Sequence, residues 1–149
     1  KPDGDILALN VVKAINKRLP SLHMVMHGSS SVPQELQDII NANGGEMPQT
    51  WGTPVDEIVE GIKHGVRKVN IDTDCRMAIS GQFRKILLEK KTEFDPRKFT
   101  KPATEAMQVV CESRYESFGT AGNASKLKPL SLTAMAGRYN SGELEQKIN

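Results

Sequence analysis

The sequence has few cysteines and no strong excess of one charge. Its two cysteines, Cys75 and Cys111, match no metal-ligand or redox spacing and fall in different predicted helices, so we expect them to lie apart and to have no role. Such sparse cysteine fits a reducing compartment. The 20 basic and 18 acidic residues leave a net charge of +2, and the basic residues are scattered along the chain. We therefore expect neither a nucleic-acid nor a membrane-surface partner.

Long apolar runs are missing as well. No stretch reaches the roughly 18 consecutive apolar residues of a membrane span, and the polar residues 1–5 are unlike the apolar core of a signal peptide. These absences predict a soluble, cytoplasmic protein. The chain also starts with Lys1 rather than methionine, so we expect a piece of a longer polypeptide. Its 149 residues suffice for one sizeable core and one domain.

Apolar periodicity and helix-end signals predict helices that alternate with strands. The expected elements are a helix over 6–19, a strand over 22–27, helices over 33–42 and 54–64, a strand over 66–71, and helices over 72–91, 102–118 and 132–139. Thr53 is expected to cap the helix that starts at Pro54, and residues 92–101 to form a turn. A polar tail is expected after Gly142.

This order of elements indicates the α/β class. Strands separated by helices pair in parallel through right-handed crossovers. A parallel sheet of two strands cannot cover both of its faces or stand alone. We therefore predict that the chain is the end of a larger α/β barrel or doubly wound sheet, whose earlier strands lie on a piece of chain before Lys1.

Polar side chains follow both predicted strands. The first strand ends at His27 and leads into a Gly/Ser loop over residues 28–31, whose hydroxyls and unpaired N–H groups at a helix start suit a phosphate. The second strand ends in Asn70, Asp72 and Thr73. Because the carboxyl ends of parallel strands share one rim, and this rim holds the active site of α/β barrels, we expect these groups to converge there.

Each of these signals also fits a structural role when it is taken alone. A histidine at a strand end is often only hydrogen-bonded, and a Gly/Ser loop or an Asn-x-Asp-Thr sequence is often only a helix start. Their joint appearance after two successive strands favours a site. By contrast, His23 lies at the opposite end of its strand and His64 lies in the last turn of a helix, where the dipole favours a cation. We expect both to be structural.

Two motifs in the order of the predicted strands carry a family resemblance. They are VMHGSSSVP over 25–33 and KVNIDTDCRMA over 68–78. Both closely resemble class II, metal-dependent fructose-1,6-bisphosphate aldolases. The segments that resemble the type B branch of that family are residues 1–5, Gly52-x-Pro54, Asp95-Pro96-Arg97 and FGTAG over 118–122. The resemblance covers nearly the whole chain.

The resemblance implies a (β/α)₈ TIM barrel of more than about 300 residues in the intact enzyme. Residues 1–149 would be the C-terminal portion of that single barrel domain, with its last two strands and their helices. Residues 119–149 would be a helical C-terminal extension and tail.

The resemblance also implies roles for particular residues. His27 matches a metal ligand, and Gly28 and Ser30 match positions that hold the phosphate end of dihydroxyacetone phosphate. Asn70 matches a catalytic residue that contacts the reacting three-carbon unit. The remaining matches are Asp72 and Thr73, which close around the hydroxyl and phosphate groups of that unit, Arg76, which reaches across a subunit interface to the other phosphate, and Arg97, a second candidate for that role.

The activity implied is reversible aldol cleavage of fructose 1,6-bisphosphate to dihydroxyacetone phosphate and glyceraldehyde 3-phosphate. A divalent metal stabilises the enediolate in that family. Imidazole ligands suit zinc, cobalt or iron better than magnesium, and Zn²⁺ is our first expectation, with a monovalent cation near the phosphate. The other metal ligands and the catalytic acid and base are expected on the N-terminal portion of the same enzyme, a dimer or tetramer. The alternatives are another ketose-bisphosphate aldolase, such as one for tagatose 1,6-bisphosphate, and a non-catalytic phosphate-binding fragment.

Overall fold

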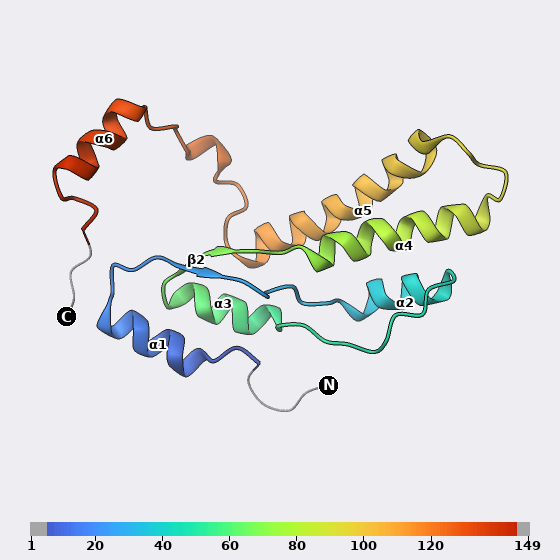
Figure 1. The fold of residues 1–149 in the computed structure, drawn as a ribbon, viewed down its shortest axis with the longest axis horizontal. Helices are drawn as coiled ribbons and strands as arrows, with labels where there is room; N and C mark the ends of the chain where they lie inside the picture. The colour runs from blue at the N-terminus through green and yellow to red at the C-terminus, as the bar shows by residue number, and fades with distance from the viewer. Residues whose placement is uncertain (1–5, 146–149) are drawn as a thin grey trace.

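The computed structural model describes residues 6–145. Its elements are α1 (Leu9–Arg18), β1 (Met24–Met26), α2 (Gln34–Ala42), α3 (Val55–Lys63), β2 (Val66–Val69), α4 (Thr73–Glu89), α5 (Pro96–Ser117), a short 3₁₀ helix (Ala124–Lys126) and α6 (Leu132–Asn140). In Figure 1 the two strands lie side by side in the middle of an elongated body, α4 and α5 form an antiparallel hairpin at one end, and α6 stands apart from the rest.

The two strands pair in parallel, as predicted. Met24 lies opposite Val66 and Met26 opposite Val69. Both strands are shorter than expected, and the prediction that the first strand is buried is wrong on one face, because the Val25 side chain is 52% exposed. Lys68, which lies opposite Val25 on β2, is exposed as well, whereas Met26 is buried.

A small core lies between the sheet and helices α1 and α3. Its buried centre is formed by Met26, Ile58 and Val66. The partly buried side chains around it are Leu7, Val12, Met24, Ile62, Val69 and Phe118. A second packed region joins α4 to α2 and α5, where Phe83 and Phe99 meet edge to face with ring centroids 5.4 Å apart. The chain therefore builds two modest packed regions.

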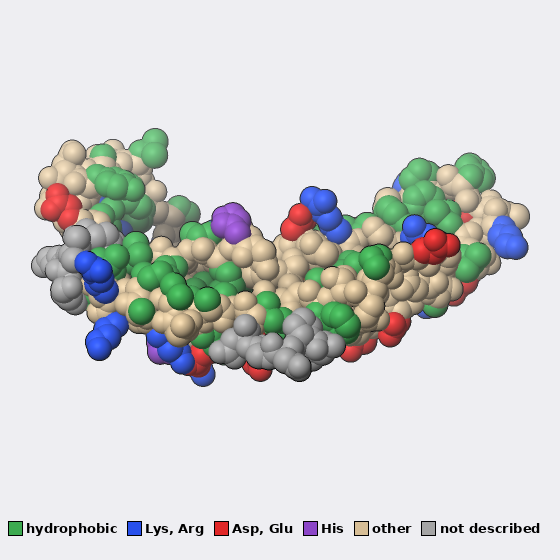
Figure 2. Space-filling view, turned by 60° about the horizontal axis from the view of Figure 1, so that its bottom comes forward, with side chains coloured by type: hydrophobic (Ala, Val, Ile, Leu, Met, Phe, Trp, Pro, Cys, Tyr) green, Lys and Arg blue, Asp and Glu red, His purple; other side chains and the backbone are tan. Residues whose placement is uncertain are grey.

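The surface of the chain is large for its mass. It exposes 10564 Å², whereas a compact monomer of 16.4 kDa exposes about 7,500 Å². Figure 2 shows hydrophobic side chains spread over the surface, including both ends of the molecule. Among those exposed by more than half are Phe94, Val109, Leu127, Leu132 and Tyr139. Although 149 residues would suffice for one sizeable core, the described elements do not wrap around a common centre.

Helix α5 begins six residues earlier than predicted. Asp95 caps it by accepting the Arg97 N–H at 3.0 Å, and Pro96 occupies the first helical position, where a missing N–H costs nothing. Pro102 therefore lies inside the helix, where its ring removes one backbone hydrogen bond. The cap and the packing of α5 along α4 outweigh that loss.

After α5 the chain continues into the 3₁₀ helix and α6. In α6 the Ser131 hydroxyl accepts the Ala134 N–H at 3.1 Å and caps the helix, but no residue of α6 is buried. Within residues 6–145, no helix combines the length and the apolar character needed to cross a membrane. The predicted tail continues into 146–149, which lie outside the described residues.

Candidate functional site

The carboxyl ends of β1 and β2 are tied together directly. The backbone N–H and the side-chain Nδ2 of Asn70 both donate to the Met26 carbonyl, at 3.1 and 2.9 Å. In return the Ser29 hydroxyl donates to the Asn70 carbonyl at 2.9 Å. The structure thus brings the two predicted polar segments to one rim, and the carboxamide nitrogen of Asn70 is used to join them.

Ser30 connects the loop after β1 to the start of α4. Its hydroxyl oxygen accepts the backbone N–H groups of Asp72 at 3.2 Å and Thr73 at 3.0 Å. A serine hydroxyl has two acceptor lone pairs and one donor hydrogen. Since both lone pairs are occupied, the hydrogen of Ser30 is left to donate, and Ser30 is only half-buried. A ligand oxygen at the rim can accept it.

The other two serines of the loop point inward. The Ser29 side chain is buried, and the N–H groups of Ser31 and Val32 donate to the Asp74 carboxylate at 3.0 and 2.8 Å. We expected the loop over 28–31 to offer unpaired N–H groups to an external anion, and at Ser31 this prediction is wrong. A carboxylate of the chain itself already fills that position.

Asp74 is fully buried and forms an ion pair with Arg114. The Arg114 Nη2 lies 3.2 Å from Asp74 Oδ2 and donates to the Ser31 hydroxyl at 2.6 Å. Neither residue stands out in the sequence as a site residue. An aspartate in the first turn of a helix reads as an ordinary helix start, and Arg114 lies 40 residues further along the chain. Only the packing of α5 on α4 brings the two side chains together.

A third segment, Gly52-Thr53, packs against the same loop. The Thr53 N–H donates to the Ser30 carbonyl at 3.0 Å, and the Thr53 hydroxyl donates to the Gly28 carbonyl at 3.3 Å. The prediction that Thr53 caps α3 is therefore wrong. Its hydroxyl is engaged with the loop, and no side chain caps that helix. At Gly52 a Cβ atom would collide with the Ser30 carbonyl oxygen and lie 2.8 Å from the Ser31 carbonyl carbon.

Arg76 and Asp72 pair on the exposed side of the first turn of α4. The Arg76 Nε and Nη2 donate to the two carboxylate oxygens of Asp72, each at 2.8 Å. The side chains are 76% and 67% exposed, so both remain accessible. Arg97 forms a similar pair with Asp95 at the start of α5, and its guanidinium holds the pKa of Asp95 below the usual range. Each arginine thus has a local acidic partner.

His27 follows β1 directly and is exposed, so its ring nitrogens are open to a ligand. Within residues 6–145, no group of three or more His, Cys, Asp or Glu side chains could hold a metal ion. The His64 Nε2 lies 3.1 Å from Glu60 Oε1, a contact that fits the structural role expected of His64. Hydrogen bonds from Lys13, Lys63 and His64 lower the pKa of Glu60 to about 2.

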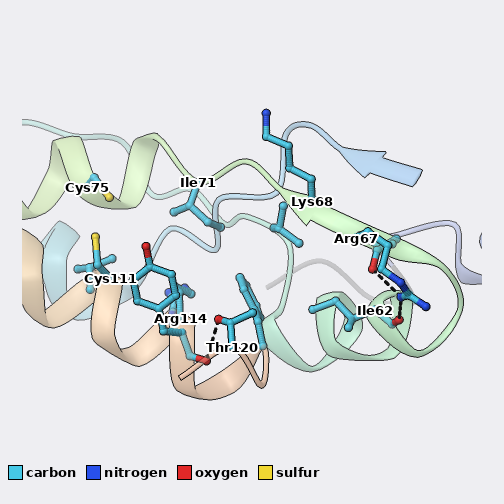
Figure 3. A pocket seen from close by; sticks show the side chains of 13 residues that line it. Ile62, Arg67, Lys68, Ile71, Cys75, Cys111, Arg114 and Thr120 are labelled. Carbon is cyan, nitrogen blue, oxygen red and sulfur yellow. Dashed lines mark hydrogen bonds between the residues drawn. The ribbon is translucent and has the colours of Figure 1, made fainter. Parts of the chain in front are cut away.

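A cavity of about 480 Å³ lies between β2 and the C-terminal half of α5. Figure 3 shows Cys75 of α4 and Cys111 of α5 at one end of it, with their sulfur atoms turned toward each other. Burial and the neighbouring Cys111 raise the pKa of the Cys75 thiol. The expectation that the two cysteines lie apart is wrong, because the antiparallel packing of α4 and α5 brings residues 36 positions apart side by side.

Comparison with known proteins identifies the family. Residues 1–123 match the family described as "Fructose-bisphosphate aldolase class-II". The chain belongs to this family. It is 65% identical over 147 residues to fructose-bisphosphate aldolase 2 of Cereibacter sphaeroides, which covers 99% of this chain and 42% of that protein. It is 59% identical over 145 residues to the fructose-bisphosphate aldolase of Sinorhizobium medicae (strain WSM419), covering 97% of this chain and 40% of that protein.

The similarity extends beyond the part that the family description covers. The fructose-bisphosphate aldolase of Stutzerimonas stutzeri is 59% identical over 148 residues, which is 99% of this chain and 42% of that protein. The similarity to these relatives therefore continues after residue 123. The chain spans about two fifths of the length of the relatives that it matches.

Proposed function

We propose that this chain is the C-terminal portion of a class-II fructose-bisphosphate aldolase, which cleaves fructose 1,6-bisphosphate reversibly to dihydroxyacetone phosphate and glyceraldehyde 3-phosphate. Its two strands are the last two of a (β/α)₈ barrel, and residues 119–149 are a C-terminal extension and tail of that barrel. The observation that carries this proposal is the joined rim, where the Ser30 hydroxyl accepts two N–H groups from the start of α4 and keeps its hydrogen for a ligand. The names of the relatives support the sugar bisphosphate as substrate.

The exposed surface supports a larger fold. The chain exposes roughly 3,000 Å² more than a compact protein of its mass, and the β1–β2 pair has an uncovered face at Val25. A parallel sheet is stable when both of its faces are covered. The N-terminal portion of the same enzyme is the partner that completes the barrel.

The proposed site combines phosphate binding with metal binding at the same rim. Gly28 and Ser30 hold one phosphate, with Asp72 and Thr73 beside it, and Asn70 contacts the three-carbon unit. His27 fits as one ligand of a divalent metal, since its imidazole is exposed at the end of β1. The metal, Zn²⁺ by the preference of imidazole, supplies a Lewis acid for the substrate carbonyl, and its other ligands come from the N-terminal portion.

The wider setting of the proposed enzyme follows from the same family. It acts in the cytoplasm as a homo-oligomer, a dimer or a tetramer. Arg76 extends to the second phosphate of a substrate in a neighbouring subunit, which its 76% exposed side chain permits.

The proposal is tested on the full-length enzyme. His27→Ala is expected to lower bound metal and cleavage of the bisphosphate together, measured by elemental analysis and a coupled assay. Ser30→Ala is expected to raise KM by about 10- to 100-fold, the equivalent of about 1.5–3 kcal/mol for one charge-assisted hydrogen bond, with metal content unchanged. The matched control is Ser117→Ala, whose hydroxyl donates only to the Ser113 carbonyl within α5.

Four outcomes would contradict parts of the proposal. Unchanged metal content and activity in His27→Ala would return His27 to a structural role. An unchanged KM in Ser30→Ala would leave Ser30 as a link between loop and helix. A wild-type enzyme that binds inorganic phosphate but cleaves no sugar bisphosphate would favour the non-catalytic alternative, and a higher kcat/KM for tagatose 1,6-bisphosphate would reassign the substrate.

A further inference from the structure

The segment after the proposed phosphate loop is held by a carboxylate that the substrate cannot reach. Asp74 is fully buried, and its Oδ2 accepts the Ser31 N–H and the Ser31 hydroxyl, both at 3.0 Å. Its Oδ1 accepts the Val32 N–H at 2.8 Å. A buried carboxylate is stable only when such donors and a cation compensate its charge.

The cation comes from α5, far along the chain. The Arg114 side chain is 14% exposed, and its Nη2 contacts both the Asp74 carboxylate and the Ser31 hydroxyl. Ser31 Oγ therefore donates to Asp74 and accepts from Arg114, so it lies between the two charged groups. These contacts join α4, α5 and the loop after β1 into one buried polar cluster, which we define as Ser31, Asp74 and Arg114.

The loop needs this support because its backbone is strained. Val32 has a φ of +50°, a conformation that is costly for a β-branched residue. Such a residue keeps that conformation only when its surroundings fix it. The Asp74 carboxylate fixes its N–H, and the Gln34 side chain donates to its carbonyl at 3.0 Å. Relaxation at Val32 would rotate the peptides before it, including the one that follows Ser30.

We propose that Asp74 and Arg114 are positioning residues, which fix the Ser30 hydroxyl for the substrate phosphate by holding Ser31 and Val32 from behind. This inference rests on the proposed function, because it assigns the determinants of phosphate affinity for that same site. It places one of them on α5, 83 residues after Ser31. Neither side chain touches the substrate, and each acts through the loop.

Arg114→Ala in the full-length enzyme is the main test. Loss of the guanidinium leaves Asp74 without its cation and frees the Ser31 hydroxyl, so KM for fructose 1,6-bisphosphate is expected to rise about 10-fold or more, with kcat within about threefold and metal content unchanged. The matched control is Arg84→Ala, since Arg84 also donates to a loop carbonyl, that of Gly44 at 2.7 Å, but far from the strand ends. The control is expected to keep the wild-type KM.

Chemical rescue separates positioning from a general loss of structure. Guanidinium chloride at low-millimolar concentration is expected to enter the space left by Arg114→Ala and to lower KM toward the wild-type value. Urea at the same concentration is the neutral control and is expected to leave KM unchanged. Rescue requires a folded enzyme with a prepared anionic site, so a merely destabilised variant would not respond.

Ser31→Ala keeps the test decisive if Arg114→Ala fails to fold. This smaller change removes only the hydroxyl between the two charged groups, and KM is expected to rise about threefold or more. A folded Arg114→Ala enzyme with wild-type KM, a raised KM that guanidinium does not lower, or a wild-type KM in Ser31→Ala would each overturn the inference. A wild-type enzyme without cleavage activity would instead overturn the proposed function itself.

Discussion

Two regions of the chain are stabilised in opposite ways. The strand-end junction, which we define as residues 26–32, 52–53 and 70–76, is joined by hydrogen bonds between residues 23 to 44 positions apart, such as Thr53 to Ser30 and Asn70 to Met26. The extension, residues 119–145, shows within the described chain only hydrogen bonds between residues at most six positions apart, such as Ala121 to Tyr115 and Arg138 to Glu143.

The difference indicates where substitutions should matter. In a junction built from distant segments, one side chain contacts more than one segment. A single substitution there therefore disturbs the positions of several segments. An extension built from local contacts loses little when one contact is removed. The family match ends at residue 123, close to the boundary between the two regions. The predictions below compare changes in the two regions and between them, beginning with the largest expected effect.

The first prediction concerns Gly52 in the junction. Gly52→Ala is expected to lower kcat/KM by up to about 100-fold, because the new Cβ would meet the backbone of Ser30 and Ser31, which has no flexible end that can move aside. Steady-state kinetics of the full-length enzyme measure this. Wild-type kinetics would mean that the junction absorbs the collision, and the contrast between the two regions would fail.

The second prediction compares two exposed arginines, one at the junction and one outside it. Arg76 and Arg97 each pair with an acidic neighbour, Asp72 and Asp95, in similar geometry. Arg76→Ala is expected to lower kcat/KM for the bisphosphate about 10- to 100-fold while changing that for fructose 1-phosphate much less, because only the first substrate carries the far phosphate. Arg97→Ala is the matched variant.

The two substrates decide between the arginines. Equal losses on both sugars in Arg76→Ala would exclude a phosphate role for Arg76. A selective loss in Arg97→Ala alone would move that role to the start of α5, outside the junction. A fully active monomer would exclude contact across subunits.

The third prediction concerns the Glu60 cluster, which we define as Glu60, Lys13, Lys63 and His64. It joins distant segments near the surface. Glu60 of α3 contacts Lys13 of α1, and its pKa is lowered from 4.5 to about 2. A carboxylate whose pKa is lower in the folded than in the unfolded state stabilises the fold fully at pH values above its unfolded pKa. This stabilisation is lost as the pH falls to the folded pKa, here between pH 4.5 and about 2.

Glu60→Gln is therefore expected to reduce the acid sensitivity of the enzyme. The fall in Tm between pH 5 and pH 3 should be smaller than in the wild type, measured by thermal denaturation. The control is Glu112→Gln, since the Glu112 carboxylate accepts from Gln108 within α5. An identical fall in Tm in Glu60→Gln and wild type would show that this exposed cluster contributes nothing to the pH dependence of thermal stability between pH 5 and pH 3.

The fourth and smallest effect is expected in the extension. A Cβ added at Gly137 meets no atom within 4 Å, so Gly137→Ala is expected to stabilise α6 by roughly 0.5–1 kcal/mol through helix propensity. Amide hydrogen exchange in α6 should slow about two- to fivefold, while KM stays at the wild-type value. A raised KM would mean that the extension shapes the site, and the two regions would no longer be separable.

Much of the fold could be predicted because it depends on local patterns. Apolar periodicity located the α-helices of the described residues but not the 3₁₀ helix over Ala124–Lys126. The alternation with two strands predicted their parallel pairing, which Met24 opposite Val66 confirms. The early start of α5 was missed although Asp95-Pro96 is a helix-start signal, since Pro102 suggested a later one. Pro102 is compatible with a helix start, but the Asp95 cap and Pro96 begin α5 six residues earlier.

The site could be predicted only where the order of strands along the chain determines which residues lie at the same end of the sheet. Parallel strands must end on one side, and this alone brings Ser30 to the start of α4 and Asn70 to Met26. The hydrogen-bond partners of Ser31 and Thr53 could not be predicted, because a hydroxyl or N–H group bonds to whichever acceptor the packing places beside it.

By itself, the sequence determined the elements, the parallel order of the strands and the family, through spacing and motifs that act over a few residues. The tertiary structure alone decided that Asp74 fills the loop after β1, that Arg114 compensates it, and that Cys75 lies beside Cys111. The physical reason is that these contacts depend on how α5 packs along α4. That packing sums many weak apolar contacts, whereas a buried charge accepts only the few partners that the packing leaves within reach.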